Sequence, residues 1–439
     1  MASTAAQVAH VWRRLGFGPA PGDVAAWTGA GPQALAAALL TVPPTGPADW
    51  AWPFTGDWTE VGKYEARLLE LMTTSPCQVQ ERMAFLLMGL LVTAFKENLQ
   101  YEELKEHIGR LREGALGSYA TVLSQVTAST AMQMYLDGVN STEEHPNENL
   151  GRELCELFAL GVTHPVTGQP CYTEGDVKEI ARALTGYRLD WNVMQVYHDP
   201  SGWDAGPKTF LGQSRGAAGL PEVVQAVTTH PSFPYFVARR VYKELVGLQP
   251  DAAALEALVA AAGPGVNLLA LVQAVAGRPE FLSDLAVGVR VKCPIELVVG
   301  ALRVLQLGDL ERFYLGWALT ELQQHPFRAP NVNGWPSGSA WLHAGQLIQW
   351  STVAQMLCWS DDGSPGVPVA QQCVTIRTLH ASASGAPAGD LALELAGLVD
   401  PSVETLQAVR DYAAGGAWTF DRARAVMNLV LVSPEFLVN

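Results

Sequence analysis

Apolar residues recur every three or four positions along most of the chain, which is the spacing of one face of an α-helix. Residues 83–91 are apolar on all sides of a predicted helix, so we expect them at the centre of the core. The pattern predicts a mainly α fold: a large multi-helix, bundle-like domain with long Gly/Pro/Trp-rich loops and little or no β-structure. The predicted helices cover 4–15, 22–40, 59–73, 78–95, 101–113, 116–136, 149–161, 173–186, most of 220–307 and most of the chain after 341.

Three stretches interrupt this periodicity: 43–58, 187–219 and 325–341, each rich in Gly, Pro or Trp. The stretch 187–219 is long for a connection without secondary structure, and such loops are often functional. We therefore predict a functional loop there, with room for a short hairpin. We expect residues 1–439 to form a single module, which allows a subdivision into helical halves 1–190 and 220–439 on either side of this loop.

Composition restricts the classes of function. The chain is 49% hydrophobic and 16% charged, which argues against disorder. Its formal net charge of −15 disfavours nucleic acid as a partner. No apolar run reaches the roughly 18 residues needed to span a bilayer, so we expect no membrane association. The six cysteines form no C-x-x-C motif, which favours reduced thiols and a cytoplasmic location.

The segment 145–158 carries the densest group of potentially chemical side chains. On a helix, Asn149, Glu153 and Glu156 fall at positions i, i+4 and i+7 and so share one face. Arg152 lies one turn from both Glu148 and Glu156, at spacings that allow ion pairs. Two interpretations remain open. One is a capped surface helix with internal salt bridges, and the other is a carboxylate pair that binds a divalent metal or acts as acid and base.

Two further polar groups follow along the chain. Thr173 and Asp176 have the spacing of a capping box. Arg182 lies among apolar residues and needs a carboxylate partner, which we expect to be Glu153 or Glu156. His198-Asp199, followed by Lys208, is a weak catalytic or metal signal, and an isolated surface histidine is the alternative. The chain contains no G-x-S-x-G, Walker, H-E-x-x-H or dinucleotide-binding motif in the required context.

Several motifs follow one another along the chain: Arg13-Arg14-Leu15-Gly16-Phe17-Gly18-Pro19; Asn147-Glu148-Asn149, Arg152-Glu153-Leu154 and Glu156-Leu157; Tyr172-Thr173, Asp176-Val177, Ala181-Arg182 and Leu184-Thr185-Gly186; His198-Asp199, Lys208 and Leu211-Gly212; and Asn331-Val332-Asn333-Gly334-Trp335-Pro336 with Gly338 and Trp341. In this order they resemble the bacterial domain-of-unknown-function family 1800 (DUF1800), over nearly the whole chain. The resemblance implies one family module, and it implies joint action with a protein partner, because members often occur beside an alkaline-phosphatase-like family.

The sequence departs from the family pattern at three positions. The resemblance implies a histidine-rich run after Glu81-Arg82, but the histidine positions hold Met88 and Leu90. A further histidine is implied two residues after Glu156, where this chain has Phe158. If those imidazoles bind a metal in relatives, this chain has lost three ligands. A metal would then depend on Glu153, Glu156, Asp176, His198 and Asp199.

Three hypotheses about function follow. The first is an enzyme that performs metal-assisted oxidation or hydrolysis of a small molecule, with a divalent transition metal at Glu153, Glu156 and His198. Its catalytic residues would be Glu153, Glu156, Arg152, His198 and Asp199, and its binding residues would be Glu81, Arg82, Asn147, Glu148, Asn149, Asp176, Arg182, Lys208 and Trp335.

The second hypothesis is a non-catalytic scaffold or partner protein that has lost an ancestral metal site. The third is a small-molecule-binding protein with a pocket lined by tryptophans such as Trp50, Trp52, Trp335 and Trp341. An enzyme should have an enclosed pocket in which Glu153 or Glu156 is unpaired by arginine, whereas a scaffold should bridge every carboxylate and expose a large apolar patch.

Overall fold

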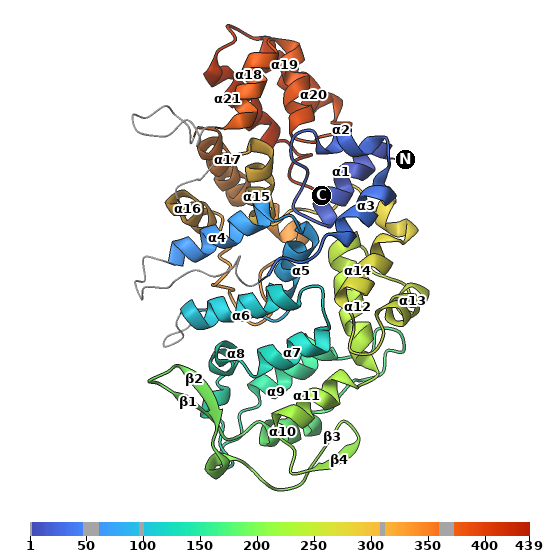
Figure 1. The fold of residues 1–439 in the computed structure, drawn as a ribbon, viewed down its shortest axis with the longest axis vertical. Helices are drawn as coiled ribbons and strands as arrows, with labels where there is room; N and C mark the ends of the chain where they lie inside the picture. Colours follow the sequence, from blue (N-terminus) through green and yellow to red (C-terminus); the bar gives the residue numbers. More distant parts are fainter. Residues whose placement is uncertain (1, 47–60, 96–100, 308–311, 360–372) are drawn as a thin grey trace.

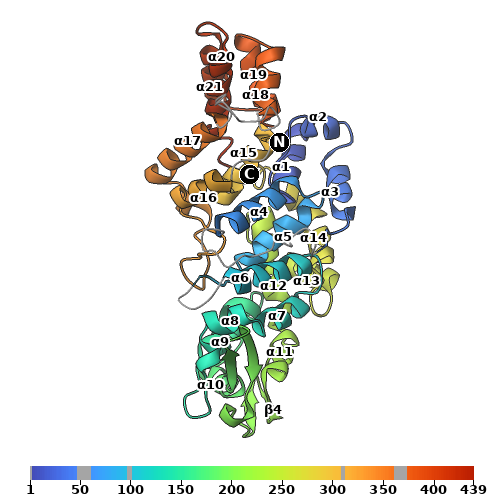
Figure 2. The same cartoon turned by 60° about the vertical axis from the view of Figure 1, so that its left-hand side comes forward.

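The computed structural model describes residues 2–46, 61–95, 101–307, 312–359 and 373–439. Within these ranges the regular structure is helical apart from two small two-stranded sheets, which confirms the predicted mainly α fold. The helices stack in three groups along the long axis of the molecule (Figures 1 and 2).

The central group begins with the N-terminal helices. α1 packs against α2 and α3, α4 packs against α15 and α16, and α5 packs against α6. The N-terminal helices are α1 (Thr4–Arg14), α2 (Asp23–Thr28), α3 (Pro32–Thr41), α4 (Val61–Thr74), α5 (Gln78–Met88) and α6 (Tyr101–Gly114). The same group contains α12 (Ser232–Val246), α13 (Ala252–Ala262), α14 (Leu268–Ala276), α15 (Pro294–Leu305), α16 (Arg312–Glu321) and α17 (Ala344–Trp359).

The lower group in Figure 1 holds the signature segment and both sheets. Its helices are α7 (Tyr119–Thr127), α8 (Thr130–Tyr135), α9 (Asn149–Glu153), the π-helix η4 (Leu154–Ala159), α10 (Glu174–Ala183) and α11 (Leu220–Thr228). β1 (Tyr187–Asp190) pairs antiparallel with β2 (Gln195–His198), and β3 (Lys208–Phe210) pairs with β4 (Gln213–Gly216). The predicted loop 187–219 is therefore largely two hairpins.

The third group, at the top of Figure 1, is formed by the C-terminal helices. α19 packs against α20, and α21 contacts α17, α18 and α20. Its helices are α18 (Val374–Ser382), α19 (Ala386–Leu395), α20 (Val403–Ala414) and α21 (Phe420–Leu431).

Two predicted helices are shorter in the structure than in the sequence pattern. The helix predicted over 78–95 ends at Met88, and the chain then pairs with the loop after α16 through an Ala94–Arg328 bridge. The helix predicted over 116–136 is broken at Ala128, and Ser129 caps a new helix. In both cases, partners distant in sequence and local caps satisfy the backbone groups that a longer helix would have used.

Many helix starts follow directly from local sequence. At eight helix starts, the side chain of the N-cap residue accepts a hydrogen bond from an amide of the first turn, which satisfies a donor that the helix cannot pair itself. These residues are Ser3, Ser118, Ser129, Thr173, Asp251, Asn267, Ser402 and Thr419.

The six cysteines are all free and buried. None of the helices in the described ranges combines the length and apolar composition needed to cross a bilayer. The predicted Trp50 and Trp52 lie outside the described residues.

Candidate functional site

The helix predicted over 149–161 has two parts. It is α-helical over α9 and then widens into the π-helix η4, which ends where the amides of Leu160 and Gly161 both donate to the Cys155 carbonyl (3.1 and 2.9 Å). Gly161 has φ +74°, a conformation that favours glycine. Because Glu153 precedes the π-turn and Glu156 lies within it, their relative positions depart from regular α-helical spacing.

Arg152 links α9 to α10 through ion pairs. Its guanidinium binds both oxygens of Glu174 at 2.9 Å and Glu148 Oε2 at 2.8 Å. The predicted pair with Glu148 is confirmed. Arg152 does not bind Glu156 and instead binds Glu174 at the start of α10. Hydrogen bonding to Arg152 lowers the pKa of Glu174, so Arg152 stabilises this local structure.

Glu153 and Glu156 are half-buried and form no ion pair with the described residues. Glu156 accepts a hydrogen bond from the Tyr172 hydroxyl at 3.3 Å. Burial, and then the charge of Glu156, raises the pKa of Glu153. The two carboxylates are therefore unpaired by arginine, which is one of the two features that the enzyme hypothesis predicts.

The expected partner of Arg182 was wrong. Its Nε binds Asp204 Oδ2 at 2.6 Å and its Nη1 binds Glu179 Oε1 at 2.8 Å, whereas Glu153 and Glu156 do not contact it. The loop after β2 folds back over α10 and brings Asp204 to this arginine, a contact that sequence distance does not reveal.

Lys208 has a similar structural role, with a side chain that is 1% exposed. Its Nζ donates to the carbonyls of Asp204 and Gly206 and lies 5.2 Å from the ring centroid of Trp203. Lys208 therefore stabilises the conformation of the loop between β2 and β3.

Of the residues predicted as metal ligands, Glu153 and Glu156 lie near each other, but His198 and Asp199 have other partners. His198 is exposed at the end of β2, where its ring contacts those of Tyr187 and Trp203 at 5.2 and 5.5 Å. Asp199 accepts from the amide and hydroxyl of Ser201 (3.0 and 2.7 Å) and caps a short turn. Among the residues that the structure places, no group of three or more His, Cys, Asp or Glu side chains could hold a metal ion.

The other signature polar residues organise the backbone. Asn147 accepts from the Asn149 amide at 2.8 Å, and its amide group donates to the Asp137 carbonyl at 3.3 Å. Asn149 itself is exposed. Asp176 completes the predicted capping box with Thr173 and also accepts from the Leu211 amide at 2.6 Å. These contacts support the capped-helix interpretation for this part of the signature.

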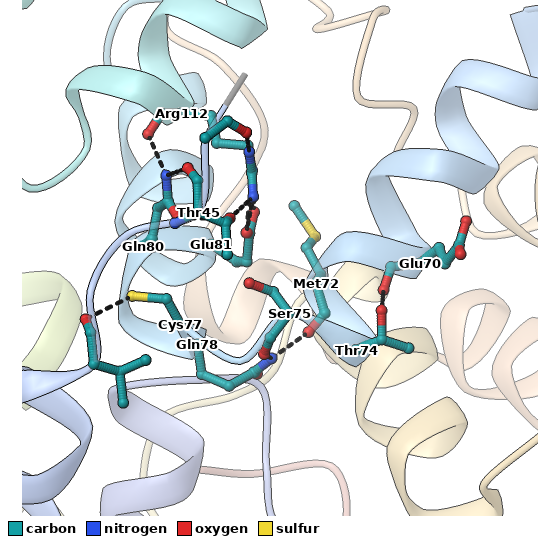
Figure 3. Close-up of polar contacts among 12 residues, drawn as sticks. Thr45, Glu70, Met72, Thr74, Ser75, Cys77, Gln78, Gln80, Glu81 and Arg112 are labelled. Carbon is teal, nitrogen blue, oxygen red and sulfur yellow. Dashed lines mark hydrogen bonds and ion pairs between the residues drawn. The ribbon is translucent and has the colours of Figure 1, made fainter. Parts of the chain in front are cut away.

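Glu81, predicted as a binding residue, lies in a buried ion pair instead. Arg112 binds it through Nε at 2.9–3.0 Å and through Nη2 at 2.7 Å, and both side chains are at most 1% exposed. Figure 3 shows this pair beside Thr45 and Gln80, which complete the arginine's surroundings. Gln80 donates to the Arg112 carbonyl at 3.2 Å. The group joins α5 to α6.

A second polar centre surrounds the next residue, Arg82. Its Nη1 binds Glu296 Oε1 at 2.5 Å and its Nη2 binds Glu244 Oε1 at 2.8 Å. Arg290 binds the same two carboxylates, at 2.9 Å to Glu244 Oε1 and 3.1 Å to Glu296 Oε2. Two arginines and two glutamates from α5, α12, the segment before α15 and α15 itself thus form one closed network.

Glu296 is the buried anchor of this network. Burial raises its pKa, but the charges of Arg290 and Arg82 outweigh that effect and hold the pKa well below its usual range. The Cys293 amide and the Asn439 side chain donate to it as well, at 2.9 and 3.0 Å. Glu296 therefore remains charged at neutral pH and fixes both arginines.

The network forms one wall of a cavity with a volume of about 440 Å³, which we call the Arg–Glu cavity. Its cationic side chains are Arg240, Lys243 and Arg290, against the carboxylates Glu244 and Glu296. Apolar walls come from α5 and from the segment before α15, and the loop before α17 supplies the rest. The remaining lining residues are Phe85, Leu86, Gly89, Leu90, Gly247, Val289, Val291, Cys293, Gln324, Asn333, Trp335, Pro336, Ser337, Gly338 and Ser339.

Only a few residues at this cavity were predicted as binding residues from the sequence. Arg82 and Trp335 were predicted as binding residues and lie in its wall or directly behind it. Trp341 instead donates to the Pro336 carbonyl at 2.8 Å and lines a separate small cavity. The cluster of Arg240 and Lys243 resembles a solvated helix face in sequence. Arg240, Lys243, Glu244 and Gly247 stand at positions i, i+3, i+4 and i+7. This helical spacing is the sequence signal that places the four residues on one face of α12.

Comparisons with curated proteins and with solved structures find no match to this chain. A family model does match it, from residue 10 to residue 438, and the family is described as a protein of unknown function. That match covers the opening arginines, the signature segment and the loop before α17 that borders the cavity. The chain belongs to the DUF1800 family.

Proposed function

We propose that this protein binds a small organic molecule in the Arg–Glu cavity. The observation that carries the proposal is a cavity of about 440 Å³ in which fixed charges and an apolar wall meet. Small-molecule sites have volumes of roughly 300–1,000 Å³ and combine apolar walls with a few convergent polar groups. This corresponds to the small-molecule hypothesis, with Trp335 as its lining tryptophan.

The energetics of the ion-pair network support a binding role. Arg82 is 1% and Glu296 is 2% exposed, and removing such charges from water costs more than most ion pairs regain. Apolar side chains of similar size would stabilise the fold at least as well. Charges retained beside a cavity are typical of functional sites.

The family resemblance points to the same place. Leu90, where the resemblance implies a histidine, lines the Arg–Glu cavity. One of the three positions that depart from the family pattern thus lines the proposed binding site.

The proposal is tested by blocking the cavity. Ser339 is exposed at its rim, so Ser339→Trp places a large ring at the opening without disturbing the core. Ser124→Trp, on the exposed face of α7, is the matched control. We would measure thermal shifts with a panel of carboxylates, phosphate esters, amines and sugars.

At least one class is expected to stabilise the wild type and the Ser124→Trp variant but not Ser339→Trp. Equal stabilisation of all three proteins, or of none of them by any class, would contradict the proposal.

The second candidate function is an enzyme that uses Glu153 and Glu156. It is favoured by their half-buried positions without an arginine partner. We would test metal assistance by elemental analysis of untagged wild type, Glu153→Ala and the exposed control Glu143→Ala. Near-stoichiometric transition metal that is lost only in Glu153→Ala is expected if a metal binds there. A metal-free wild type after supplementation during expression would rule out the metal-assisted form.

A further inference from the structure

The two carboxylates of the Arg–Glu cavity differ in how completely they are satisfied. Both oxygens of Glu296 accept hydrogen bonds, from Arg82, Arg290, the Cys293 amide and Asn439. Glu244 uses only Oε1, which both arginines share. Its Oε2 accepts no hydrogen bond from the described residues, and Glu244 is 33% exposed where it lines the cavity. The Oε2 atom of Glu244 is therefore an available hydrogen-bond acceptor on a carboxylate that two arginines hold in place.

The same face of α12 presents unpaired positive charge. Arg240 and Lys243 line the cavity, and neither side chain forms a hydrogen bond or ion pair with the part of the chain that the structure places. Arg240 lies one helical turn from Glu244, about 6 Å along the axis. Two cations without a partner among the described residues and a free carboxylate oxygen thus belong to neighbouring positions of one helix face that lines the cavity.

Another part of the cavity lining is apolar. Phe85, Leu86 and Leu90 face the cavity from α5 and the turn that follows it, and Val289 faces it from the segment before α15. A ligand that fits these walls has an apolar body and a polar end directed at α12.

We propose that the ligand is an organic anion that carries a hydroxyl or ammonium donor on the atom next to its anionic group. Arg240 and Lys243 bind the anion, Glu244 Oε2 accepts from the donor, and the α5 wall packs against the body. Arg82 and Arg290 are positioning residues, because they hold Glu244 through Oε1 and leave Oε2 free. This inference rests on the proposed function of the same cavity.

The test compares three carboxylates of one shape by isothermal titration calorimetry. Phenylacetate has no donor, mandelate has a hydroxyl group and phenylglycine has an ammonium group on the adjacent carbon. A hydrogen bond to a charged group contributes enough for about a tenfold gain in affinity or more. The wild type is therefore expected to bind mandelate, phenylglycine or both at least about tenfold more tightly than phenylacetate, and which of the two is preferred identifies the donor.

Variants assign the contacts. Glu244→Gln is expected to remove the preference and leave phenylacetate binding in place. The double variant Arg240→Gln/Lys243→Gln is expected to weaken all three probes about tenfold or more. Arg239→Gln is the matched control, because Arg239 is exposed on the same helix, does not line the cavity and donates to Gln249 at 3.2 Å. Should Glu244→Gln fail to fold, Glu244→Asp is used instead, because its side chain is one methylene shorter and moves the acceptor away from the ligand. Glu244→Asp is then expected to lose the preference for mandelate or phenylglycine over phenylacetate.

The outcomes separate the inference from the function on which it rests. Equal affinity of the wild type for the three probes overturns the role of Glu244, and unchanged binding by the double variant overturns the anion assignment. Absence of binding by all three probes also overturns the inference. The proposed function fails only if the wider ligand panel and the Ser339→Trp comparison fail as well.

Discussion

Glu81 and Arg82 are consecutive residues of α5, yet their side chains enter two separate ion-pair networks. Glu81 binds Arg112 of α6, whereas Arg82 binds Glu244 of α12 and Glu296 of α15. Neighbouring positions on an α-helix point about 100° apart, because one turn takes 3.6 residues. One face of α5 therefore forms an ion pair that connects it to α6, and a neighbouring face supports the wall of the Arg–Glu cavity.

The pair of Glu81 and Arg112 should matter strongly for stability. In Glu81→Gln, Arg112 stays buried without its charged partner, and breaking a buried pair in this way costs about 3–5 kcal/mol. We expect a loss of that size in the free energy of unfolding measured with urea. In the control Glu148→Gln, the half-buried Arg152 keeps Glu174, so stability should hardly change. Equal losses in the two variants would refute the structural role of Glu81.

Asp204 should make stability depend on pH. Burial raises its pKa, but hydrogen bonds from Arg182 and the Gly206 amide outweigh this and bring the pKa below its usual value near 3.9. The stabilisation is therefore present above about pH 4 and is lost as the pH falls through the lowered pKa. Asp204→Asn should lower the urea midpoint at pH 7, and its difference from the wild type should shrink towards pH 2.5.

The exposed Glu143→Gln variant serves as the control for Asp204, because its side chain forms no ion pair within the described ranges. It should follow the wild type at every pH. A difference between Asp204→Asn and the wild type that stayed constant from pH 7 to pH 2.5 would contradict the assigned pKa direction.

Glu153 should have the opposite pH dependence. Burial and the charge of Glu156 raise its pKa above the ordinary value near 4.3. The stabilisation by the neutral carboxyl group is present below that value and is lost as the pH rises through the raised pKa. Glu153→Gln should therefore match the wild type in urea unfolding at acid pH and exceed its stability at neutral pH. Lower stability of the variant at pH 7 would argue that an attractive contact holds Glu153.

Gly247 should resist substitution because it ends α12 beside the arginines. Its φ is +84°, and an added Cβ would lie 3.2 Å from Arg14 Nη2 and 3.7 Å from Arg290 Cβ. Gly247→Ala should cost about 1–2 kcal/mol in the free energy of unfolding from the left-handed conformation alone. Gly29→Ala, at a position with ordinary φ and open space, should cause no comparable loss. Equal stability of the two variants would show that the turn at Gly247 relaxes.

The sequence predicted those helix caps and ion pairs whose partners lie within one helical turn of each other. The capping box of Thr173 and Asp176 and the pair of Arg152 and Glu148 involve residues within one turn, so their spacing alone specified them. The π-turn in η4 left no comparable signal, and the early end of α5 depended on a bridge to Arg328. The candidate cavity was visible in sequence only as separate residues, chiefly Arg82 and Trp335.

The sequence by itself determined a mainly α protein with free cysteines, its membership of the DUF1800 family and most of its helix caps, because periodicity, spacing and motif order are properties of short segments. Only the tertiary structure decided which charges meet. Arg182 turned to Asp204 instead of Glu153 or Glu156, and Arg82 met Glu244 and Glu296 from distant helices. A buried charge takes the partner that packing brings within hydrogen-bond distance, and separation along the chain does not encode that distance.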